Sequence, residues 1–329
     1  MRLAVLAPAL IVLTTSGPGA QPSFPDAERA AAGLPRLHSL LISHRGTRVF
    51  ERYYNNRQAT DLANVKSVSK SIISALVGIA IQQRLIRSVH DPIGPYFPDV
   101  LRAKADAAKR AITIEDLLTM RSGLESTSSR NYGRWVRSSN WVRYTLMRPL
   151  EEPPGTSMEY STGNSHLLSA ILTKAAKRST WQYGQEVLAK PLGFTLARWM
   201  QDPQGIYFGG NEMMLTPRQM LAFGELYLNL GQSGSQQVVP SQWVKDSFVP
   251  RGKSDYSDQR YGYGWWMREL AGEQAYYAWG FGGQYIFVVP RLQLVVVTTS
   301  STEIAEERRS HRRSVVGLVE ELVIAPMAQ

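Results

Sequence analysis

The residues whose types and spacing could do chemistry are Ser67 and Lys70, which stand three apart as Ser67-x-x-Lys70. Residues at this spacing share one face of a helix, so the Lys70 amine would lie beside the Ser67 hydroxyl. An amine held there could take up the hydroxyl proton and activate the serine as a nucleophile. The apolar run over 72–81 predicts a buried helix, and burial would lower the lysine pKa. Alone, the tetrad fits equally a serine cap and an exposed lysine, since about one such pair is expected by chance.

Motifs for other kinds of chemistry are absent from the sequence. There is no His-Glu-x-x-His, no Gly-x-Ser-x-Gly, no Walker loop and no dinucleotide fingerprint. The five histidines show no metal-ligand spacing, and the chain has no cysteine for disulfides or thiolate sites. We therefore expect chemistry that needs no metal and no organic cofactor.

Composition indicates a globular protein of ordinary hydrophobicity. The chain has 329 residues, 43% of them hydrophobic, and a formal net charge of +10. The densest basic cluster, over 308–313, is interleaved with glutamates over 303–307. Such a mixture is typical of a solvated helix face, because neighbouring carboxylates cancel the field that phosphates would feel. We therefore expect no nucleic-acid partner.

The first 20 residues have the pattern of a signal peptide. Arg2 supplies positive charge, residues 3–13 are apolar, and residues 14–20 are small and polar. The alternative is a misassigned start or a disordered tail. The apolar stretch and the later run over 72–81 are both shorter than the roughly 20 residues that span a bilayer. We expect export to the periplasm or the medium, with no stable membrane anchor.

Sheet-forming patterns stand at both ends of the chain, and helical patterns lie between them. The apolar segments 37–44 and 47–54 flank Arg45-Gly46 as a hairpin, and 276–289 pairs with 292–299 around Pro290-Arg291. Helices are expected over 114–118, 167–176, after Thr216-Pro217 and over 305–324. The pattern predicts a discontinuous α/β lobe, 21–60 plus 262–329, around a mostly helical lobe over 61–261.

Further blocks accompany the tetrad in order along the chain. They are the run over 112–124, Pro154-Gly155-Thr156 followed by Tyr160-Ser161, and Ala278-Trp279-Gly280. With these blocks the chain resembles the serine β-lactamase and penicillin-binding-protein superfamily in its class-C-like branch. Within that branch it is most similar to 6-aminohexanoate-dimer hydrolases and esterase-like bacterial serine hydrolases. The resemblance implies an antiparallel sheet flanked by terminal helices, a helical insertion lobe and an active site between the lobes.

The resemblance also implies roles for individual residues. Ser67 would be the nucleophile that carries the acyl group, and Lys70 would hold its proton network. Tyr160 would be the general base that activates Ser67 and protonates the leaving group. Because tyrosine titrates near about 10, its phenolate would need a cationic neighbour, for which Lys70 is the candidate. The backbone N–H groups of Ser67 and Phe281 would form the oxyanion hole.

Two positions depart from the pattern of the superfamily. Thr162 stands where asparagine is usual, and Asn164 two residues later is a candidate replacement. Ala278 stands where a lysine or histidine binds the substrate carboxylate in β-lactamases and carboxypeptidases. A lost charged hydrogen bond weakens recognition by roughly 10- to 150-fold. We therefore expect weak handling of β-lactams and D-Ala-D-Ala ends, with nucleophile activation intact.

The expected function is hydrolysis of a small-molecule carboxylic ester or linear amide through an acyl-enzyme. The alternatives are a weak β-lactamase or D-amino-acid peptidase or amidase, and a non-catalytic protein that binds cell-wall fragments. His166 is expected to be a satisfied buried histidine. Residues expected to line the substrate pocket are Thr162, Asn164, Trp279, Gly280, Gly282 and Gln284. The aromatic residues Trp265, Trp266, Tyr276, Tyr277, Phe281 and Tyr285, with Trp279, fit either an apolar cleft or the core.

Overall fold

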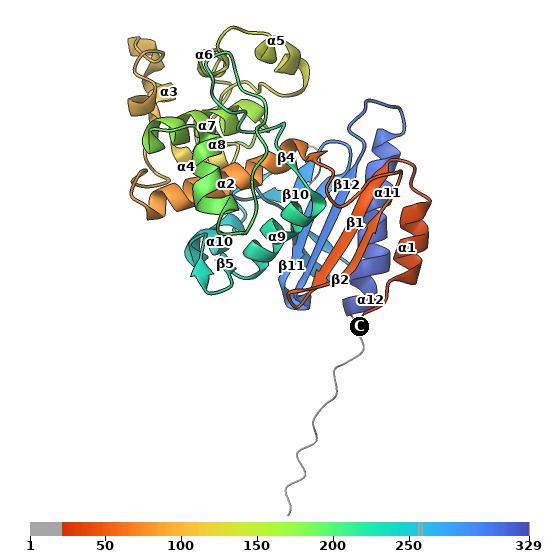
Figure 1. Cartoon of the computed structure of the whole chain (residues 1–329). Coiled ribbons are helices and arrows are strands. Elements are labelled where there is room, and N and C mark those ends of the chain that lie inside the picture. The colour runs from red at the N-terminus through yellow and green to blue at the C-terminus, as the bar shows by residue number, and fades with distance from the viewer. Residues whose placement is uncertain (1–21, 256, 258, 329) are drawn as a thin grey trace, which may run out of the picture.

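The centre of the fold is one antiparallel sheet of eight strands, in the order β2-β1-β12-β11-β10-β9-β8-β7 (Figure 1). The computed structural model describes residues 22–255, 257 and 259–328, so the predicted signal peptide lies outside the described residues. The strands are β1 (Leu37–His44), β2 (Thr47–Tyr53), β7 (Gly252–Lys253), β8 (Arg260–Tyr261), β9 (Trp266–Leu270), β10 (Glu273–Gly280), β11 (Gln284–Val289) and β12 (Leu294–Ser300). Two-stranded pairs are β3 (Ala63–Asn64) with β4 (Met214–Leu215) and β5 (Gln232–Ser233) with β6 (Gln236–Gln237).

Turn residues set where the strands begin and end. The predicted hairpin of β1 and β2 is confirmed, with Arg45 and Gly46 both at positive φ, as a two-residue hairpin turn requires. The segment 276–289, predicted as one apolar stretch, is instead divided between β10 and β11. Gly282 and Gly283 interrupt it with φ values of 90° and 109°, which only glycine adopts readily.

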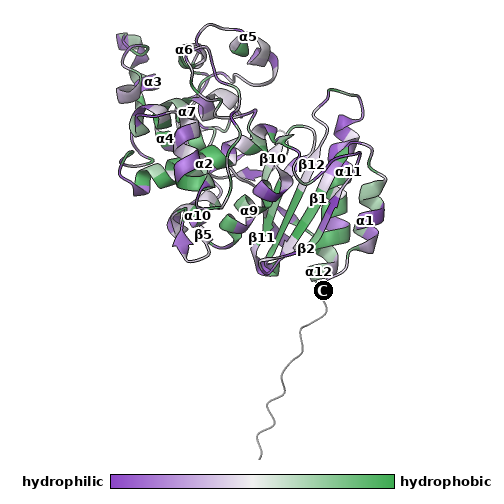
Figure 2. Ribbon diagram, viewed as in Figure 1, coloured by the Kyte–Doolittle hydropathy of each residue, from purple (hydrophilic) through white to green (hydrophobic). Residues whose placement is uncertain are grey.

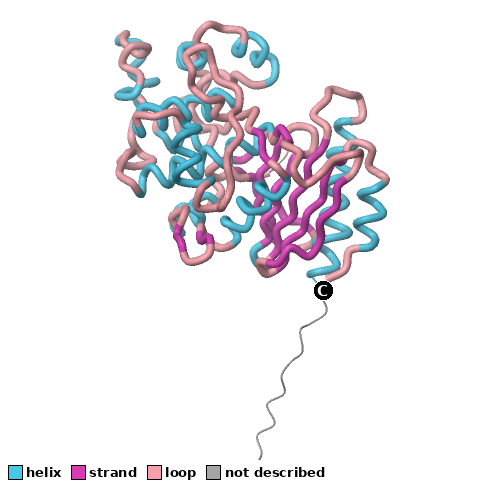
Figure 3. The backbone as a smooth tube through the Cα atoms, in the orientation of Figure 1, coloured by secondary structure: helices cyan, strands magenta, loops and turns pink. Residues whose placement is uncertain are grey.

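Helices cover both faces of the sheet (Figures 1 and 3). On one face lie α1 (Pro25–Ala32), α11 (Arg308–Val319), the π-helical segment Glu320–Ile324 and α12 (Ala325–Ala328). On the other face α9 (Pro217–Leu228) packs against β1, β11 and β12. Every residue of β11 and β12 is buried, and the central strands are correspondingly the most hydrophobic part of the sheet (Figure 2). The expected α/β fold with terminal helices flanking an antiparallel sheet is confirmed.

A mostly helical region lies beside the sheet. Its helices are α2 (Ser69–Gln82), α3 (Ala107–Ala111), α4 (Ile114–Leu118), α5 (Tyr132–Val136), α6 (Trp141–Leu146), α7 (Thr162–Ala176), α8 (Thr180–Gly184) and α10 (Ser241–Ser247). The predicted helix starts are explained by capping, since Thr113 accepts from the Asp116 N–H and Thr216 from the Gln219 N–H. As predicted, α2 is buried almost all round, and it packs against α7.

The boundaries of the predicted lobes differ from the sheet's extent. Strands β7 and β8 and helix α9 belong to the sheet layers, although all three fall within 61–261. The division of the chain into two lobes otherwise stays a prediction. In the part of the chain that the structure describes, no helix combines the length and hydropathy needed to cross a membrane.

Candidate active site

Ser67 lies in a 3-10 turn, η1 (Lys66–Val68), directly before α2. Lys66 has φ 50°, a left-handed conformation that is unfavourable for a residue with a Cβ and needs support from its surroundings. The Ser69 hydroxyl gives that support by donating to the Lys66 carbonyl at 2.6 Å. Val65 donates its N–H to the Met213 carbonyl at 2.9 Å, beside the β3–β4 pair. The turn thus presents Ser67 at the N-terminus of a buried helix.

An ion pair fixes the side chain that precedes the serine. Lys66 Nζ lies 2.8 Å from Glu212 Oε1, and both side chains are only 20% exposed. Glu212 also accepts a hydrogen bond from Asn64 Nδ2. Two residues of the 209–213 segment therefore hold the serine turn in place: Glu212 binds the Lys66 side chain, and Met213 binds the Val65 backbone.

Lys70 is buried, with 3% of its surface exposed, and its amine reaches three oxygens. Nζ lies 3.0 Å from Ser67 Oγ, 2.7 Å from the Gly210 carbonyl oxygen and 3.4 Å from Thr162 Oγ1. No carboxylate forms an ion pair with this amine among the described residues. Burial alone lowers the pKa of Lys70 to about 7, since water no longer solvates its charge.

Tyr160 lies in the loop before α7 and completes a group of three with Ser67 and Lys70. Lys70 Nζ is 4.9 Å from the centroid of the Tyr160 ring. Burial raises the pKa of Tyr160, and a hydrogen bond with the Ser67 side chain opposes this rise only in part. These directions favour a neutral phenol beside the serine, with the amine as the better proton acceptor.

Packing and hydroxyl contacts fix both Tyr160 and Thr162. The Tyr160 ring stacks on Trp266 with centroids 5.7 Å apart, and its carbonyl accepts from Ser126 Oγ at 2.7 Å. Ser128 Oγ lies 2.9 Å from Thr162 Oγ1 and also accepts the Thr162 N–H at 2.9 Å. Thr162 therefore lies beside Lys70, at the start of α7, as part of a chain of hydroxyl groups.

The end of β10 approaches the serine turn closely at Gly280. A Cβ placed on Gly280 would lie 2.2 Å from the Val65 carbonyl oxygen and 3.1 Å from the Lys66 Cβ. Only glycine permits this approach, which places the following residue, Phe281, near the turn that holds Ser67. Phe281 itself is 36% exposed, so its ring lies at the surface.

We expect Gly280→Ala to lower kcat/KM for esters by roughly 100- to 1000-fold, the usual effect of losing one oxyanion donor. The added methyl group must move either β10 or the serine turn, because its contact is a backbone atom. Initial rates with a p-nitrophenyl ester measure the effect. Gly133→Ala is the control, since a Cβ there makes only ordinary contacts of 3.5 Å or more. Unchanged kinetics in Gly280→Ala would contradict the close approach.

Two of the expected pocket residues are instead structural. Gln284 is fully buried, and its amide binds the Ser300 backbone through Nε2 to the carbonyl at 2.7 Å and Oε1 to the N–H at 3.1 Å. Asn164 is also fully buried, with Oδ1 accepting from Ser122 Oγ at 3.0 Å. Both amides are removed from solvent by core packing, so the expectation that they line a substrate pocket is corrected.

Gly282 lies in the turn after β10, and Trp279 lies on β10 beside Trp266. A Cβ on Gly282 would lie 2.5 Å from the Ser301 carbonyl oxygen, so this glycine serves the turn. Trp279 packs on Trp266, with ring centroids 6.3 Å apart, and Arg312 lies over it at 5.0 Å. Trp279 is thus separated from Tyr160 by one ring, that of Trp266.

The remaining aromatic candidates belong mainly to the core. Trp265, Trp266, Tyr277 and Tyr285 are buried, and Tyr276 stacks on Phe248 at 3.8 Å. The expectation for His166 is confirmed, since its Nε2 lies 3.0 Å from Asp202 Oδ2 with both side chains fully buried.

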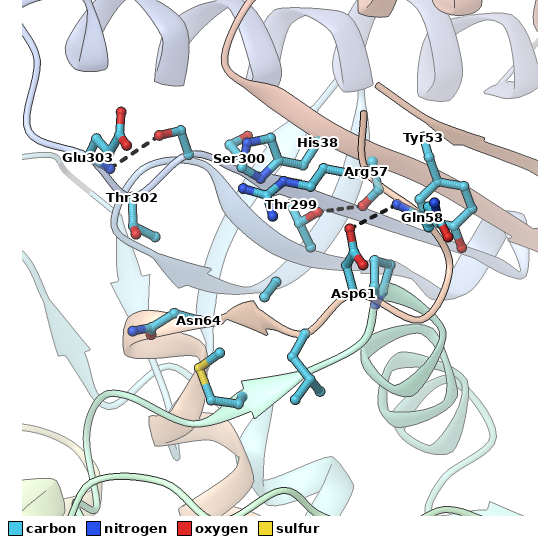
Figure 4. A pocket seen from close by; sticks show the side chains of 16 residues that line it. His38, Tyr53, Arg57, Gln58, Asp61, Asn64, Thr299, Ser300, Thr302 and Glu303 are labelled. Carbon is cyan, nitrogen blue, oxygen red and sulfur yellow. Dashed lines mark hydrogen bonds between the residues drawn. The ribbon is translucent and has the colours of Figure 1, made fainter. Parts of the chain in front are cut away.

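Two cavities lie near the site, and neither has Ser67 or Lys70 in its lining. One, of about 440 Å³, is lined by Tyr160, Glu159 and the 125–131 loop. The other, of about 240 Å³, lies between the end of β12 and residues 57–64, with His38 and Arg57 in its wall (Figure 4). The first shares Tyr160, Ser126 and Ser128 with the group of side chains around Ser67. No group of metal-ligating side chains is present among the residues described.

Several groups at the site were not expected from the sequence. They are the Gly210 carbonyl on Lys70, the hydroxyls of Ser126 and Ser128, and the Glu212 carboxylate on Lys66. Ser126 and Ser128 bind residues 34 positions away, a separation that no local pattern encodes. The Gly209-Gly210 pair is the one available signal, because adjacent glycines permit close approach of a backbone carbonyl.

Comparison with known proteins gives matches over nearly the whole described chain. A family model described as Beta-lactamase matches residues 35–320. A protein assigned as a β-lactamase from Bacteroides dorei DSM 17855 superimposes with TM-score 0.78 at 20% identity, over 93% of this chain and 99% of that one. A protein assigned as a 6-aminohexanoate-dimer hydrolase from Bacillus anthracis gives 0.70 at 19% identity, over 88% and 81%. The hydrolase EstCE1, with promiscuous acyltransferase activity, gives 0.69 at 18% identity, over 88% and 96%. No curated protein matches the sequence.

Proposed function

Because the chain belongs to the β-lactamase family and is a serine hydrolase, we propose that it cleaves small carboxylic esters or linear amides through an acyl-enzyme on Ser67. Lys70 takes the proton from Ser67, and Tyr160 passes a proton to the leaving group. This assignment differs from the expectation that Tyr160 is the base. Likeness to an esterase-type hydrolase and to a 6-aminohexanoate-dimer hydrolase is consistent with either bond type.

The three oxygens around Lys70 Nζ carry this proposal. A neutral amine has two N–H donors and one lone pair, and the Gly210 carbonyl can only accept. With Thr162 Oγ1 as the second acceptor, the lone pair is left for the Ser67 O–H at 3.0 Å. A pKa of about 7 leaves a large share of the amine neutral at neutral pH.

The reaction then follows with atoms and protons balanced. Ser67 Oγ bonds to the carbonyl carbon while its proton moves to Lys70 Nζ, and the backbone N–H groups of Ser67 and Phe281 stabilise the oxyanion. The bond to the leaving group breaks as the Tyr160 hydroxyl gives that group its proton, and Lys70 returns to Tyr160 the proton that it took from Ser67. Water then bonds to the acyl carbon as one of its protons moves to Lys70 Nζ. The bond to Ser67 Oγ breaks, Ser67 Oγ takes up that proton, and the carboxylic acid leaves.

Ala278 favours simple esters and amides over β-lactams. It is buried, with 1% of its surface exposed, and offers no charge or hydrogen bond to a substrate carboxylate. A chromogenic cephalosporin tested beside p-nitrophenyl esters and linear amides decides the substrate class. The proposal expects ester or amide turnover to exceed cephalosporin turnover by at least roughly tenfold, the effect of one lost charged contact. Cephalosporin turnover equal to that of esters would overturn the preference, and no turnover with saturable ligand binding would favour a binding protein.

Tyr160→Phe separates proton donation from base catalysis. We expect kcat to fall by roughly 100- to 10,000-fold for alkyl esters or amides, whose leaving groups need a proton. A p-nitrophenyl ester should be affected much less, because nitrophenolate leaves without protonation. Tyr261→Phe is the matched control. Tyr261 packs edge-on against Tyr160, with ring centroids 6.3 Å apart, so this substitution removes a buried phenol hydroxyl beside Tyr160. An equal loss with both substrate types would contradict the role given to Tyr160.

A further inference from the structure

A third cavity, of about 270 Å³, lies between the sheet and α11. Tyr277 and Trp279 are two residues apart on β10 and therefore point to the same face of the sheet. Tyr285 and Phe287 have the same spacing on the neighbouring β11. The register pairs Tyr277 with Phe287 and Trp279 with Tyr285, so all four rings belong to one face. Neither Ser67, Lys70 nor Tyr160 is among the residues that line this cavity.

The floor of this cavity is aromatic and rigid. Tyr285 stacks on Phe287 with centroids 4.8 Å apart and an interplanar angle of 15°. Tyr277 packs on both rings at 6.1 and 5.6 Å, and its hydroxyl donates to Gln259 Oε1 at 2.6 Å. The three rings are only 1–3% exposed, so a small part of each faces the cavity, and packing already fixes their positions before any ligand binds.

The wall of the cavity is cationic. Arg268, Arg312 and Arg313 line it, against the single carboxylate of Glu320 in the same lining. Glu320 lies 3.8 Å from Arg268 and accepts the Ala271 N–H at 3.0 Å, so its charge is already compensated. Arg312 and Arg313 form no ion pair with a carboxylate in the part of the chain described, and the Arg312 guanidinium lies over the Trp279 ring at 5.0 Å.

The charges act on the floor as well as on the wall. Burial raises the pKa of Tyr285, and the charges of Arg312 and Arg268, which line the same cavity, oppose that rise. The Trp279 indole Nε1 is buried and has no hydrogen-bond partner among the described residues. The unpartnered Trp279 N–H and the positive charge of Arg312 and Arg313 both favour a ligand that carries a negatively charged oxygen.

The two cavities described above lack this combination. The cavity of Figure 4 has charges of both signs, Arg57 against Asp61 and Glu303, and its hydroxyls are paired with each other, as Ser39 is with Thr299 at 2.6 Å. The cavity beside Tyr160 belongs to the site already described. The cavity under α11 joins an aromatic floor to a wall in which Arg312 and Arg313 have no carboxylate partner among the described residues.

We propose that the cavity under α11 is a binding site for a small carboxylate with an aromatic body, such as an arylalkanoate. The ring lies on Tyr277, Tyr285 and Phe287, and the carboxylate lies among Arg268, Arg312 and Arg313. A single guanidinium group binds a carboxylate through two parallel hydrogen bonds, and both Arg312 and Arg313 line the cavity. This site is independent of acyl transfer at Ser67, so its existence does not rest on the proposed function.

Isothermal titration calorimetry of the Ser67→Ala protein with 3-phenylpropionate tests this site without turnover. We expect saturable one-to-one binding that weakens as salt is raised, because surface-accessible ion pairs are screened. Binding of 3-phenyl-1-propanol should be weaker by roughly tenfold or more, as should that of inorganic phosphate, because each lacks one half of the ligand. Equal binding of the alcohol, equal binding of phosphate, or no saturable heat would each overturn the proposal.

Two arginine variants on the same helix locate the binding. Arg312→Gln should weaken 3-phenylpropionate binding by roughly tenfold or more. Arg309→Gln is the matched control, because Arg309 is exposed on α11 and is not among the cavity's lining residues. Thermal unfolding of both variants checks that α11 remains folded. Retained affinity in a folded Arg312→Gln protein, or an equal loss in Arg309→Gln, would overturn the assignment to this cavity.

Discussion

Ser67→Ala should reduce turnover of a p-nitrophenyl ester by at least about 10,000-fold, because no other group can form the acyl-enzyme. The matched control is Ser74→Ala on the same helix. The Ser74 hydroxyl is buried without a hydrogen-bond partner, so its removal leaves no contact broken. Steady-state rates with both variants, at equal folded concentration, measure the difference.

The activity that remains in Ser67→Ala shows whether Ser67 is the nucleophile. If Ser67→Ala retains more than a few per cent of the rate, a different nucleophile or direct attack by water must act, and the assignment of Ser67 fails. If Ser74→Ala loses as much activity as Ser67→Ala, the effect reports on the integrity of α2. Circular dichroism of each variant distinguishes a folded, inactive protein from an unfolded one.

Lys70→Met should lower kcat/KM by on the order of 1,000-fold, within the range seen when a general base is removed. In the unaltered protein kcat/KM should rise with pH through about 7. The pKa of Lys70 is lowered to about that value, so the neutral, proton-accepting amine forms as pH increases past it. Below this pH the amine is protonated and cannot accept the Ser67 proton. A pH profile of the unaltered enzyme and of the variant measures both effects.

A lysine on another helix provides the control for Lys70. Lys174 on α7 is exposed and donates to the Tyr96 carbonyl, so Lys174→Met removes an amine without touching the serine. Its rate and its pH profile should equal those of the unaltered protein. A profile that stays flat between pH 6 and pH 8 in the unaltered enzyme, about one unit either side of the expected pKa, would contradict the amine as acceptor.

The sequence allowed the nucleophile region to be predicted because its signals are local. The Ser67-x-x-Lys70 spacing and the apolar run after it are enough to expect a buried helix with the lysine beside the serine, as the structure has it. The hairpin at Arg45-Gly46 and the helix starting at Thr216-Pro217 were predictable for the same reason, since turns and caps are chosen by neighbouring residues.

Contacts between distant segments could not be predicted in this way. Gln284 follows the Phe281 turn closely in sequence and was therefore expected to line the pocket. In the structure β12 runs beside it, and both polar atoms of the Gln284 amide bind the Ser300 backbone. The Gly210 carbonyl reaches Lys70 across 140 residues, and no periodicity specifies which carbonyl will do so. The pKa order of Lys70 and Tyr160 likewise depends on tertiary burial, which local spacing does not contain.

Covalent labelling tests the central claim most directly. The protein should be incubated with a fluorophosphonate probe, measured as an intact mass, and then digested to locate the adduct. We expect one adduct per chain on the peptide that contains Ser67, formed faster as pH rises through about 7. An adduct on any other serine would contradict the role of Ser67 as nucleophile. So would ester turnover by protein that a saturating concentration of the probe leaves unlabelled.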